Sequence, residues 1–168
     1  MTGTGLRSRP ATSDDAAAIA TIYNQGIEDR QATFETRPRE VDEVRGWFDG
    51  SHPIVVVEDG GQVVAFASTS TYRPRECYAG VAEFGVYVAR QARGRGAGRV
   101  AMEALVEAAR DAGFWKLVSR IFTTNEASLR LMRATGFREV GTYERHGRLD
   151  GRWLDVVIVE RLIPETQQ

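Results

Sequence analysis

The sequence contains very few of the residues that most often build metal and disulfide sites. It has one cysteine, Cys77, and two histidines, His52 and His146, among 168 residues. A single cysteine can form no disulfide within the chain, and no cluster of His and Cys has the spacing of zinc ligands. We therefore expect no bound metal, and the lone thiol is typical of a protein from a reducing compartment.

Strong net charge and long apolar runs are absent as well. The chain has 22 Lys and Arg against 23 Asp and Glu, and a net charge of -1 argues against nucleic acid or an anionic membrane as partner. Apolar runs are no longer than a strand, and the N-terminus lacks the apolar segment of a signal peptide. With 42% hydrophobic residues, the composition predicts one cytoplasmic domain over residues 1–168, frayed at 1–5 and 164–168.

One stretch, residues 83–98, joins a strand pattern to a glycine-rich turn that is followed by a helix. Aromatic and β-branched residues alternate over 84–88, as in a strand. Three glycines then occupy alternate positions over 94–98, where the backbone can adopt positive φ and no Cβ blocks a ligand. Apolar residues recur at helical spacing over 101–112, which places the glycines at a helix N-terminus with unpaired amides. This turn is a candidate pyrophosphate site.

Two other motifs also bind phosphate with glycine-rich backbone amides at a helix N-terminus, but their sequences differ from this one. A P-loop needs Lys followed by Ser or Thr after its last glycine, whereas Arg99-Val100 follows here. A dinucleotide fingerprint needs Gly-x-Gly-x-x-Gly after the first strand of a βαβ unit, whereas these glycines alternate in mid-chain. From the loop alone, a glycine-rich connector that binds nothing is a further alternative.

The rest of the chain alternates between strand and helix patterns. Periodicity and turn residues predict strands at 6–10, 54–58, 62–70, 78–88, 116–122, 138–145 and 153–162, and helices at 13–28, 41–48, 98–112 and 125–135. Asp59-Gly60-Gly61 predicts a tight hairpin, and residues 146–152 read as a polar turn between the last two strands. This order favours an α/β (α+β) fold with a mixed, mostly antiparallel sheet flanked by about four helices.

Several motifs together resemble one family over essentially the whole chain. Two motifs resemble those of the GNAT acetyltransferase superfamily: Arg93-x-x-Gly96-x-Gly98 and Asn125-x-x-Ser128-x-x-Leu131-Met132-x-x-x-Gly136-Phe137. Four further segments resemble a narrower group within this superfamily, the phosphinothricin and methionine sulfoximine N-acetyltransferases with their arsinothricin relatives. These segments are Thr33-Phe34, Tyr72-Arg73-Pro74-Arg75, Glu83-x-x-Val86-Tyr87-Val88 and Gly151-Arg152-Trp153-Leu154-Asp155. These enzymes acetylate the α-amine of a small amino acid whose side chain ends in a tetrahedral oxyanion or its mimic, and so give resistance to it.

The resemblance implies a GNAT-like fold, acetyl-CoA as cofactor and a homodimer. The strand would pair with the pantetheine arm, the loop amides would hold the pyrophosphate, and Asn125 would lie near the reacting end. The cofactor-binding residues implied in this way are Val86, Tyr87, Val88, Arg93, Gly94, Arg95, Gly96, Ala97, Gly98, Asn125 and Ser128. For Arg93, Arg95 and Arg99, ordinary surface charge is the alternative.

Glu83 occupies the position of the catalytic glutamate in this resemblance. An α-ammonium must lose a proton before its nitrogen can attack a thioester, and a carboxylate can accept that proton directly or through one water. The alternative is a strand residue that faces solvent or pairs with Arg75. We expect direct transfer, with the carbonyl polarised by a strand amide near Val86, rather than an acyl-enzyme on Cys77.

An anionic group of the substrate is expected at Arg73 and Arg75, because a guanidinium can hold a carboxylate or phosphinate by two parallel hydrogen bonds. Arg75 matches a substrate-binding arginine of the phosphinothricin enzymes and ranks first. Tyr78 would add a hydroxyl contact. Phe34 is either a pocket wall or a local packing anchor. His146 is assigned to structure or to a subunit contact.

One position departs from the family. Met132 stands where many GNAT enzymes have a tyrosine that protonates the departing CoA thiolate, and methionine has no proton to donate. Either the thiolate leaves unassisted, or Tyr87, Ser128 or a water supplies the proton, and Met132 is also a candidate core residue. Two rival functions stay open: an acetyltransferase for a protein N-terminus, polyamine or aminoglycoside, and an acyl-CoA-binding module without turnover.

Overall fold

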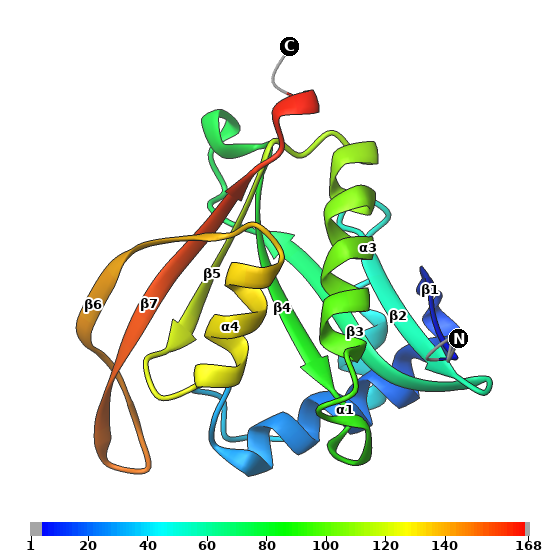
Figure 1. Ribbon diagram of the computed structural model, residues 1–168, viewed down its shortest axis with the longest axis horizontal. Helices are drawn as coiled ribbons and strands as arrows, with labels where there is room; N and C mark the ends of the chain where they lie inside the picture. Colours follow the sequence, from blue (N-terminus) through cyan, green and yellow to red (C-terminus); the bar gives the residue numbers. More distant parts are fainter. Residues whose placement is uncertain (1–4, 167–168) are drawn as a thin grey trace.

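A computed structural model describes residues 5–166, which form a seven-stranded mixed sheet with helices against both faces (Figure 1). The sheet order is β1-β2-β3-β4-β5-β7-β6, and every neighbouring pair is antiparallel except β4 and β5. The strands are β1 (Leu6–Pro10), β2 (Ile54–Asp59), β3 (Gln62–Thr71), β4 (Val81–Val88), β5 (Lys116–Phe122), β6 (Arg138–Leu149) and β7 (Arg152–Leu162). The expected fold class and order of elements are confirmed.

The helices are α1 (Ala16–Asp29), α2 (Val41–Arg45), α3 (Ala97–Asp111) and α4 (Glu126–Ala134). A 3-10 turn, Ser13–Asp15, replaces the first turn of the expected first helix. The Asp15 carboxylate accepts from the Thr12 amide and from both terminal nitrogens of Arg9, each at 2.8 Å. These bonds fasten the start of α1 to β1. The second helix is shorter than expected, since α2 ends at Arg45.

The two faces of β4 carry different layers of the core. On one face Tyr87 packs edge-on against Tyr23 of α1 at 5.0 Å between ring centroids and stacks on Phe66 of β3 at 5.4 Å. On the other face Phe84 packs 4.9 Å from Phe137, next to α4. In Figure 1 α3 and α4 lie in front of the sheet, and α1 crosses behind its lower end. The period-two pattern of β4 therefore serves two apolar layers.

The pairing between β4 and β5 is short. It covers Val81 with Lys116, Ala82 with Leu117 and Glu83 with Val118, and then stops. Beyond Glu83, β4 continues to Val88 beside β3 alone, and β5 continues to Phe122 beside β7. The two strands therefore separate at Glu83.

The last hairpin corrects a prediction. β6 runs through His146 to Leu149, so the polar turn expected over residues 146–152 is wrong, and the turn is only Asp150-Gly151, both at positive φ. Most of β6 is exposed and polar on both faces, so it lacks the apolar alternation that marks a strand. In Figure 1 this hairpin extends away from the rest of the sheet.

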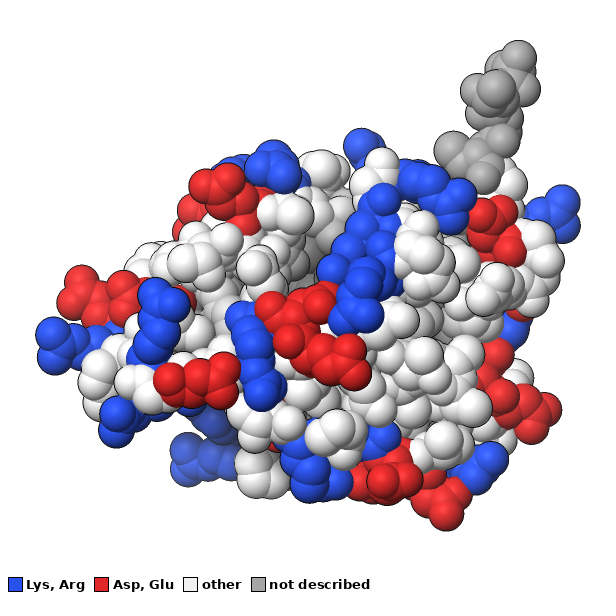
Figure 2. All heavy atoms as spheres, turned by 90° about the horizontal axis from the view of Figure 1, so that it is seen from below, with Lys and Arg blue, Asp and Glu red and all other residues white. Residues whose placement is uncertain are grey.

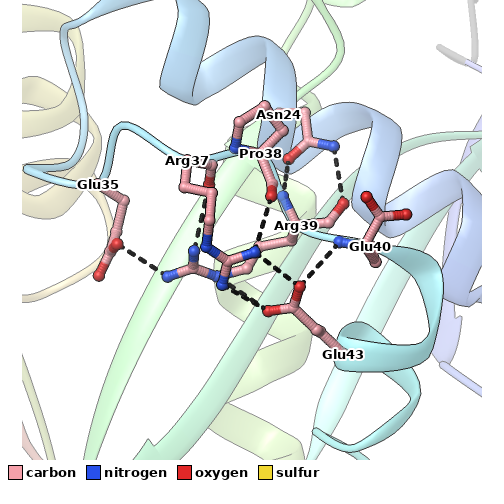
Figure 3. Close-up of polar contacts among 7 residues, drawn as sticks. All are labelled: Asn24, Glu35, Arg37, Pro38, Arg39, Glu40 and Glu43. Carbon is pink, nitrogen blue, oxygen red and sulfur yellow. Dashed lines mark hydrogen bonds and ion pairs between the residues drawn. The ribbon is translucent and has the colours of Figure 1, made fainter.

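The loop between α1 and α2 is held by a polar network (Figure 3). The Asn24 side chain accepts from the Arg39 amide at 2.8 Å and donates to the Arg39 carbonyl oxygen at 3.0 Å. Arg39 pairs with Glu35 at 2.9 Å, and Arg37 makes two bonds to Glu43 at 2.8 and 2.9 Å. A loop with little apolar content is thereby fixed to both helices.

The C-terminal end differs from expectation. Pro164–Thr166 form a 3-10 turn rather than a frayed end, and the Thr166 hydroxyl donates to the Phe114 carbonyl oxygen at 2.7 Å. Of the frayed ends expected at 1–5 and 164–168, residues 1–4 and 167–168 lie outside the described residues. Within residues 5–166, no helix has both the length and the apolar character needed to cross a bilayer.

Candidate active site

Glu83 lies at the point where β4 and β5 separate. Its side chain is 30% exposed, and its Oε1 accepts a hydrogen bond from Nη2 of Arg120 on β5 at 3.3 Å. Arg75, the partner considered from the sequence, is not the partner found. The Ser119 hydroxyl donates to the Phe84 carbonyl oxygen at 2.9 Å, bridging the strands just past the last paired residues. Glu83 is thus half-buried and paired, yet open to the space between the strands.

A cavity of about 170 Å³ fills this space. It is lined from β4 by residues 83–87 and from β5 by residues 119–121, and Asn125 and Ser128 close it at the start of α4. The β4 backbone past Glu83 has no strand partner on this side. An extended ligand with amide groups can therefore pair with β4 here as an added strand would.

A second cavity of about 610 Å³ continues from the first, and the two share Ala32, Val86, Tyr87, Asn125 and Ser128. Its far end is lined by Arg93 and Gly94, at the glycine loop. The shared residues make one continuous channel from Glu83 to the N-terminus of α3. The channel matches a long ligand with a reactive group at one end and phosphates at the other.

The glycine loop has the backbone that its sequence predicts at two of three positions. Gly94 and Gly96 have φ of 80° and 86°, and a Cβ at either would meet nothing within 4 Å. The two residues are therefore needed for their backbone conformation. Gly98 does not share it, because it lies inside α3, and its Cβ would come 3.1 Å from the Leu131 side chain. The third glycine serves helix packing instead.

The arginines of the loop are already paired with acids. Arg93 Nη2 lies 2.6 Å from Asp29 Oδ2, Arg95 pairs with Asp59 at 3.2 Å, and Arg99 pairs with Glu103 at 2.9 Å. Of these three only Arg93 lines the large cavity. The Asp29 Oδ2 atom is not placed for a well-directed hydrogen bond, so the Arg93 contact is an ion pair without good hydrogen-bond geometry. Figure 2 shows a face on which basic and acidic side chains are likewise interspersed.

Asn125 joins α4 to the loop after α1. Its Oδ1 accepts from the Ser128 amide at 3.2 Å, which caps the helix, and its Nδ2 donates to the Gln31 carbonyl oxygen at 3.1 Å. Both Asn125 and Ser128 line the two cavities at their junction. One side chain therefore shapes the helix end and the channel wall together.

The candidates for protonating a thiolate differ in environment. Met132 is 1% exposed and belongs to the core. Desolvation raises the pKa of Tyr87 well above its usual range, which makes its hydroxyl a weaker acid. Ser128, the other hydroxyl among the candidates from the sequence, also lines the channel.

A third cavity, of about 100 Å³, opens on the other side of Glu83, and we call it the acceptor chamber. It shares Glu83, Ser119 and Arg120 with the channel. Its lining residues are Tyr72, Arg73, Glu83, Val118, Ser119, Arg120, Tyr143, His146 and Ile158. Glu83 and Arg120 thus lie between the channel and a small chamber.

The substrate residues expected from the sequence are only partly gathered there. Arg73 lines the acceptor chamber, with its guanidinium 4.9 Å from the centre of the Tyr72 ring. Arg75 and Tyr78 do not line it: Arg75 precedes a 3-10 turn, and Tyr78 packs edge-on against Tyr72 at 5.6 Å.

Phe34 also lies outside the acceptor chamber. Its ring packs 4.8 Å from Phe122 and fills the space beside Gly147, where a Cβ would come within 2.7 Å of it. Of the two alternatives considered for this residue, its position corresponds to the packing anchor.

Arg120 and His146 were missed as site residues. Arg120 lies in a strand composed mainly of apolar residues. Nothing in the local sequence shows that β5 separates from β4 at this point. His146 was placed in a turn, whereas the longer β6 carries it to the chamber, 4.8 Å from the Tyr143 ring. Within residues 5–166 there is no group of three or more His, Cys, Asp or Glu side chains placed to hold a metal ion.

The sequence profile described as the acetyltransferase (GNAT) family matches residues 19–137. The chain belongs to this family. A phosphinothricin N-acetyltransferase from Streptomyces coelicolor is 35% identical over 96% of this chain and 99% of its own length. An L-methionine sulfoximine/L-methionine sulfone acetyltransferase from Pseudomonas paraeruginosa is 34% identical over 95% of each chain.

A solved structure supports the same relation. The GNAT superfamily phosphinothricin acetyltransferase from Sinorhizobium meliloti, in complex with acetyl-CoA, superposes with a TM-score of 0.88 at 30% identity, covering 95% of this chain and 89% of that one. The GNAT chain described here is therefore an acyltransferase that uses acetyl-CoA. The channel fits that cofactor, because it combines an unpaired strand edge with two glycines at positive φ before α3.

Proposed function

We propose that this GNAT protein acetylates the α-amine of small amino-acid analogues of the phosphinothricin, methionine sulfoximine and arsinothricin type. One observation carries the proposal: Glu83 lines both the channel and the acceptor chamber, and Arg73 lines that chamber with it. A base at the junction can reach an amine that enters from the chamber and an acetyl group that arrives along the channel. The names of the two curated relatives support the same class of substrate.

Glu83 acts as the general base in this proposal. Acetyl-CoA supplies an activated acetyl thioester. The Glu83 carboxylate accepts one proton from the substrate ammonium, directly or through a water, and frees the lone pair of the nitrogen. The new C–N bond then forms as the C–S bond breaks, and the sulfur keeps the electron pair of the broken bond. The second proton lost by the nitrogen passes to the sulfur by way of Ser128, or to water, so that an amide and free CoA result.

The channel residues hold and polarise the reacting groups. The amides along Val86, Tyr87 and Val88 pair with the pantetheine arm, and one near Val86 donates to the thioester carbonyl oxygen. The loop amides from Arg93 through Gly98 hold the pyrophosphate, with Arg93 and Arg95 adding charge and Asn125 shaping the reacting end. A CoA thiolate can leave with Ser128 as a proton source or unassisted, since a thiol pKa of about 8.5 makes it a tolerable leaving group.

The anionic end of the substrate is assigned to Arg73 first. Arg73 lines the acceptor chamber, whereas Arg75 and Tyr78 do not. This reverses the order suggested by the sequence. Phe34 supports the chamber indirectly, through Gly147 of β6.

The exposed part of the β6–β7 hairpin supports a homodimer. Val140, Tyr143 and Trp153 are 46, 52 and 55% exposed, and Tyr143 also lines the acceptor chamber. A second copy that covers these side chains would remove apolar surface from water. We further infer that the protein works in the cytoplasm, where acetyl-CoA is available, and that acetylation inactivates toxic analogues and so gives resistance.

A panel of amines tests the proposal. Release of CoA thiol from acetyl-CoA is measured with L-phosphinothricin, L-methionine sulfone, arsinothricin, spermidine, kanamycin and an alanine-terminated peptide. We expect stimulation by the first three. Stimulation by one of the others alone would assign a different acceptor, and binding of acetyl-CoA without any turnover would favour a binding module.

The matched variant pair is Glu83→Gln and Glu76→Gln. Glu83→Gln keeps the size and polarity of the side chain but removes the base, so kcat should fall by about 10²-fold or more while acetyl-CoA still binds. Glu76 lies in the exposed turn before β4 and does not line the chamber, so its variant should keep wild-type turnover.

A further inference from the structure

We propose that Arg120 binds the α-carboxylate of the acceptor, and that the Glu83–Arg120 pair therefore selects α-amino acids over amines that lack a neighbouring anion. The inference rests on the proposed function and adds a residue and a rule of selectivity to it. The observation behind it is that Arg120 lines both the channel and the acceptor chamber and donates to Glu83 at 3.3 Å.

The strands hold Arg120 in this position. On one side β5 pairs with β7, with Arg120 opposite Ile158. On the other side the neighbouring Ser119 hydroxyl is bonded to the Phe84 carbonyl oxygen of β4. The backbone that carries Arg120 is thus fixed relative to the backbone that carries Glu83, and only the side chains are free to change partner.

The ion pair is placed to be exchanged. The Arg120 side chain is 51% exposed and Glu83 is 30% exposed, and the single bond between them is at the long end of the hydrogen-bond range. Among the described residues, Glu83 is the one acidic side chain paired with Arg120. Separating the Glu83 and Arg120 side chains, which water can reach, therefore costs little free energy unless one of them is left without a counter-charge.

An α-amino acid provides both counter-charges at once. Its ammonium and its carboxylate are separated by a single carbon, so they can approach two groups that were in contact with each other. The ammonium binds Glu83, the carboxylate binds Arg120 by charge-assisted hydrogen bonds, and no charge is left unpaired. An amine without that carboxylate takes Glu83 and leaves Arg120 unpaired at the mouth of the chamber.

The distance from the base separates the roles of the two arginines. A group in contact with Glu83 can reach only an anion next to the reacting amine, which is the α-carboxylate. Arg73 lines the same chamber from the segment after β3. In this inference it binds the distal end of the acceptor. The chamber then presents one guanidinium for each end of an amino acid whose side chain ends in an oxyanion.

The test compares two acceptors that differ only at the α-carboxylate. L-methionine sulfone has a neutral distal group, so its α-carboxylate is its only anion, and L-methionine sulfone carboxamide lacks that anion. In Arg120→Gln we expect kcat/KM for the acid to fall by at least about tenfold, as for loss of a charged hydrogen bond. For the carboxamide it should change by less than about twofold, so the preference of the wild type for the acid disappears.

Arg130→Gln is the matched control. Arg130 lies on α4 with its side chain 68% exposed, and its nearest acid is Glu126 at 3.9 Å, so this variant should retain the preference for the acid. Thermal denaturation and the Kd for acetyl-CoA report whether Arg120→Gln is folded. Arg120→Lys, which keeps the charge, should restore part of the preference.

Two results would overturn the inference. An equal loss with acid and carboxamide, with the same change in the pH profile of kcat/KM for both, would mean that Arg120 acts only on Glu83. An unchanged preference would remove Arg120 from the acceptor site. In both cases the proposed function stands, because the wild type still acetylates the amino acid. If the wild type acetylates no free amino acid, the proposed function fails, and this inference fails with it.

Discussion

The side chain of Asn125 donates to the carbonyl oxygen of Gln31 at 3.1 Å, across 94 positions of the sequence. This bond joins the first turn of α4 to the loop after α1, and both residues line the large cavity. The loop is also tied to α1 by the bonds between Asn24 and Arg39 and to α2 by the bonds between Arg37 and Glu43. The wall of the channel is therefore set by contacts between distant parts of the chain.

Replacing Asn125 should affect stability and cofactor binding together. Asn125→Ala removes the cap of α4 and the bond to Gln31, so we expect a loss of about 1 kcal/mol in the free energy of unfolding. The KM for acetyl-CoA should also rise. Asn125→Ser keeps a capping oxygen but cannot reach Gln31 in the same way, and it should recover the stability more than the KM. Urea denaturation and steady-state kinetics measure the two effects.

The glycine loop gives a second prediction. Gly96→Ala forces a residue with a Cβ to φ of 86°, and Gly113→Ala imposes a similar strain at φ of 91°, after the other end of α3. Both should lose about 1 kcal/mol of stability. Only Gly96→Ala should weaken acetyl-CoA binding, as measured by the rise in Tm on adding the cofactor. Equal rises in Tm for the two variants would separate Gly96 from the phosphate site.

The assignment of Arg73 to the distal anion of the substrate can be tested with two acceptors. L-phosphinothricin has a distal anion and L-methionine sulfone has none. Arg73→Gln should therefore raise the KM for L-phosphinothricin by about tenfold and leave that for L-methionine sulfone nearly unchanged. Arg75→Gln is the matched variant, and a larger effect there would restore the ranking suggested by the sequence.

The stability of the turn after α2 should depend on pH. Partial burial acts to raise the pKa of Asp49, but hydrogen bonds from the backbone amides of His52 and Ser51 and from the His52 ring outweigh it and lower the pKa to about 2. Because the folded value is below the unfolded one, this contribution is present above pH ~4 and is lost as pH falls toward 2.

Asp49→Asn should therefore destabilise the protein at pH 6 and make little difference near pH 2. We expect about 1 kcal/mol at pH 6, after allowing for screening at a carboxylate that is 46% exposed. Urea unfolding at the two pH values measures it. A difference that persists at pH 2 would contradict the assignment to the charge of Asp49.

Local patterns were sufficient for most of the fold. The alternation in β4, the hairpin residues Asp59-Gly60-Gly61 and the cap at Asn125 each act within a few residues, and the elements appear where these signals predict them. The strand predicted at 138–145 is shorter than β6 because the exposed residues of β6 show no apolar periodicity. Gly98 looked like the other two glycines, although its backbone is helical.

The candidate site was harder to predict because it depends on the path of two strands. Glu83 is visible in the motif, but its partner Arg120 is 37 residues away and meets it only because β5 departs from β4 there. His146 reaches the chamber only through the length of β6. Arg75 and Tyr78 share a short loop with Arg73, and the residue-level pattern does not show which of the three points inward.

The backbone pairing of β4 with β5 covers three residue pairs, so the two halves of the sheet are joined by a short ladder. A linear cofactor that pairs along β4 would bridge β4 and β5 where the two strands are not paired with each other. Amide hydrogen exchange in Gly85–Val88 should therefore slow sharply once acetyl-CoA is present, and the two halves of the protein should then unfold as one cooperative unit.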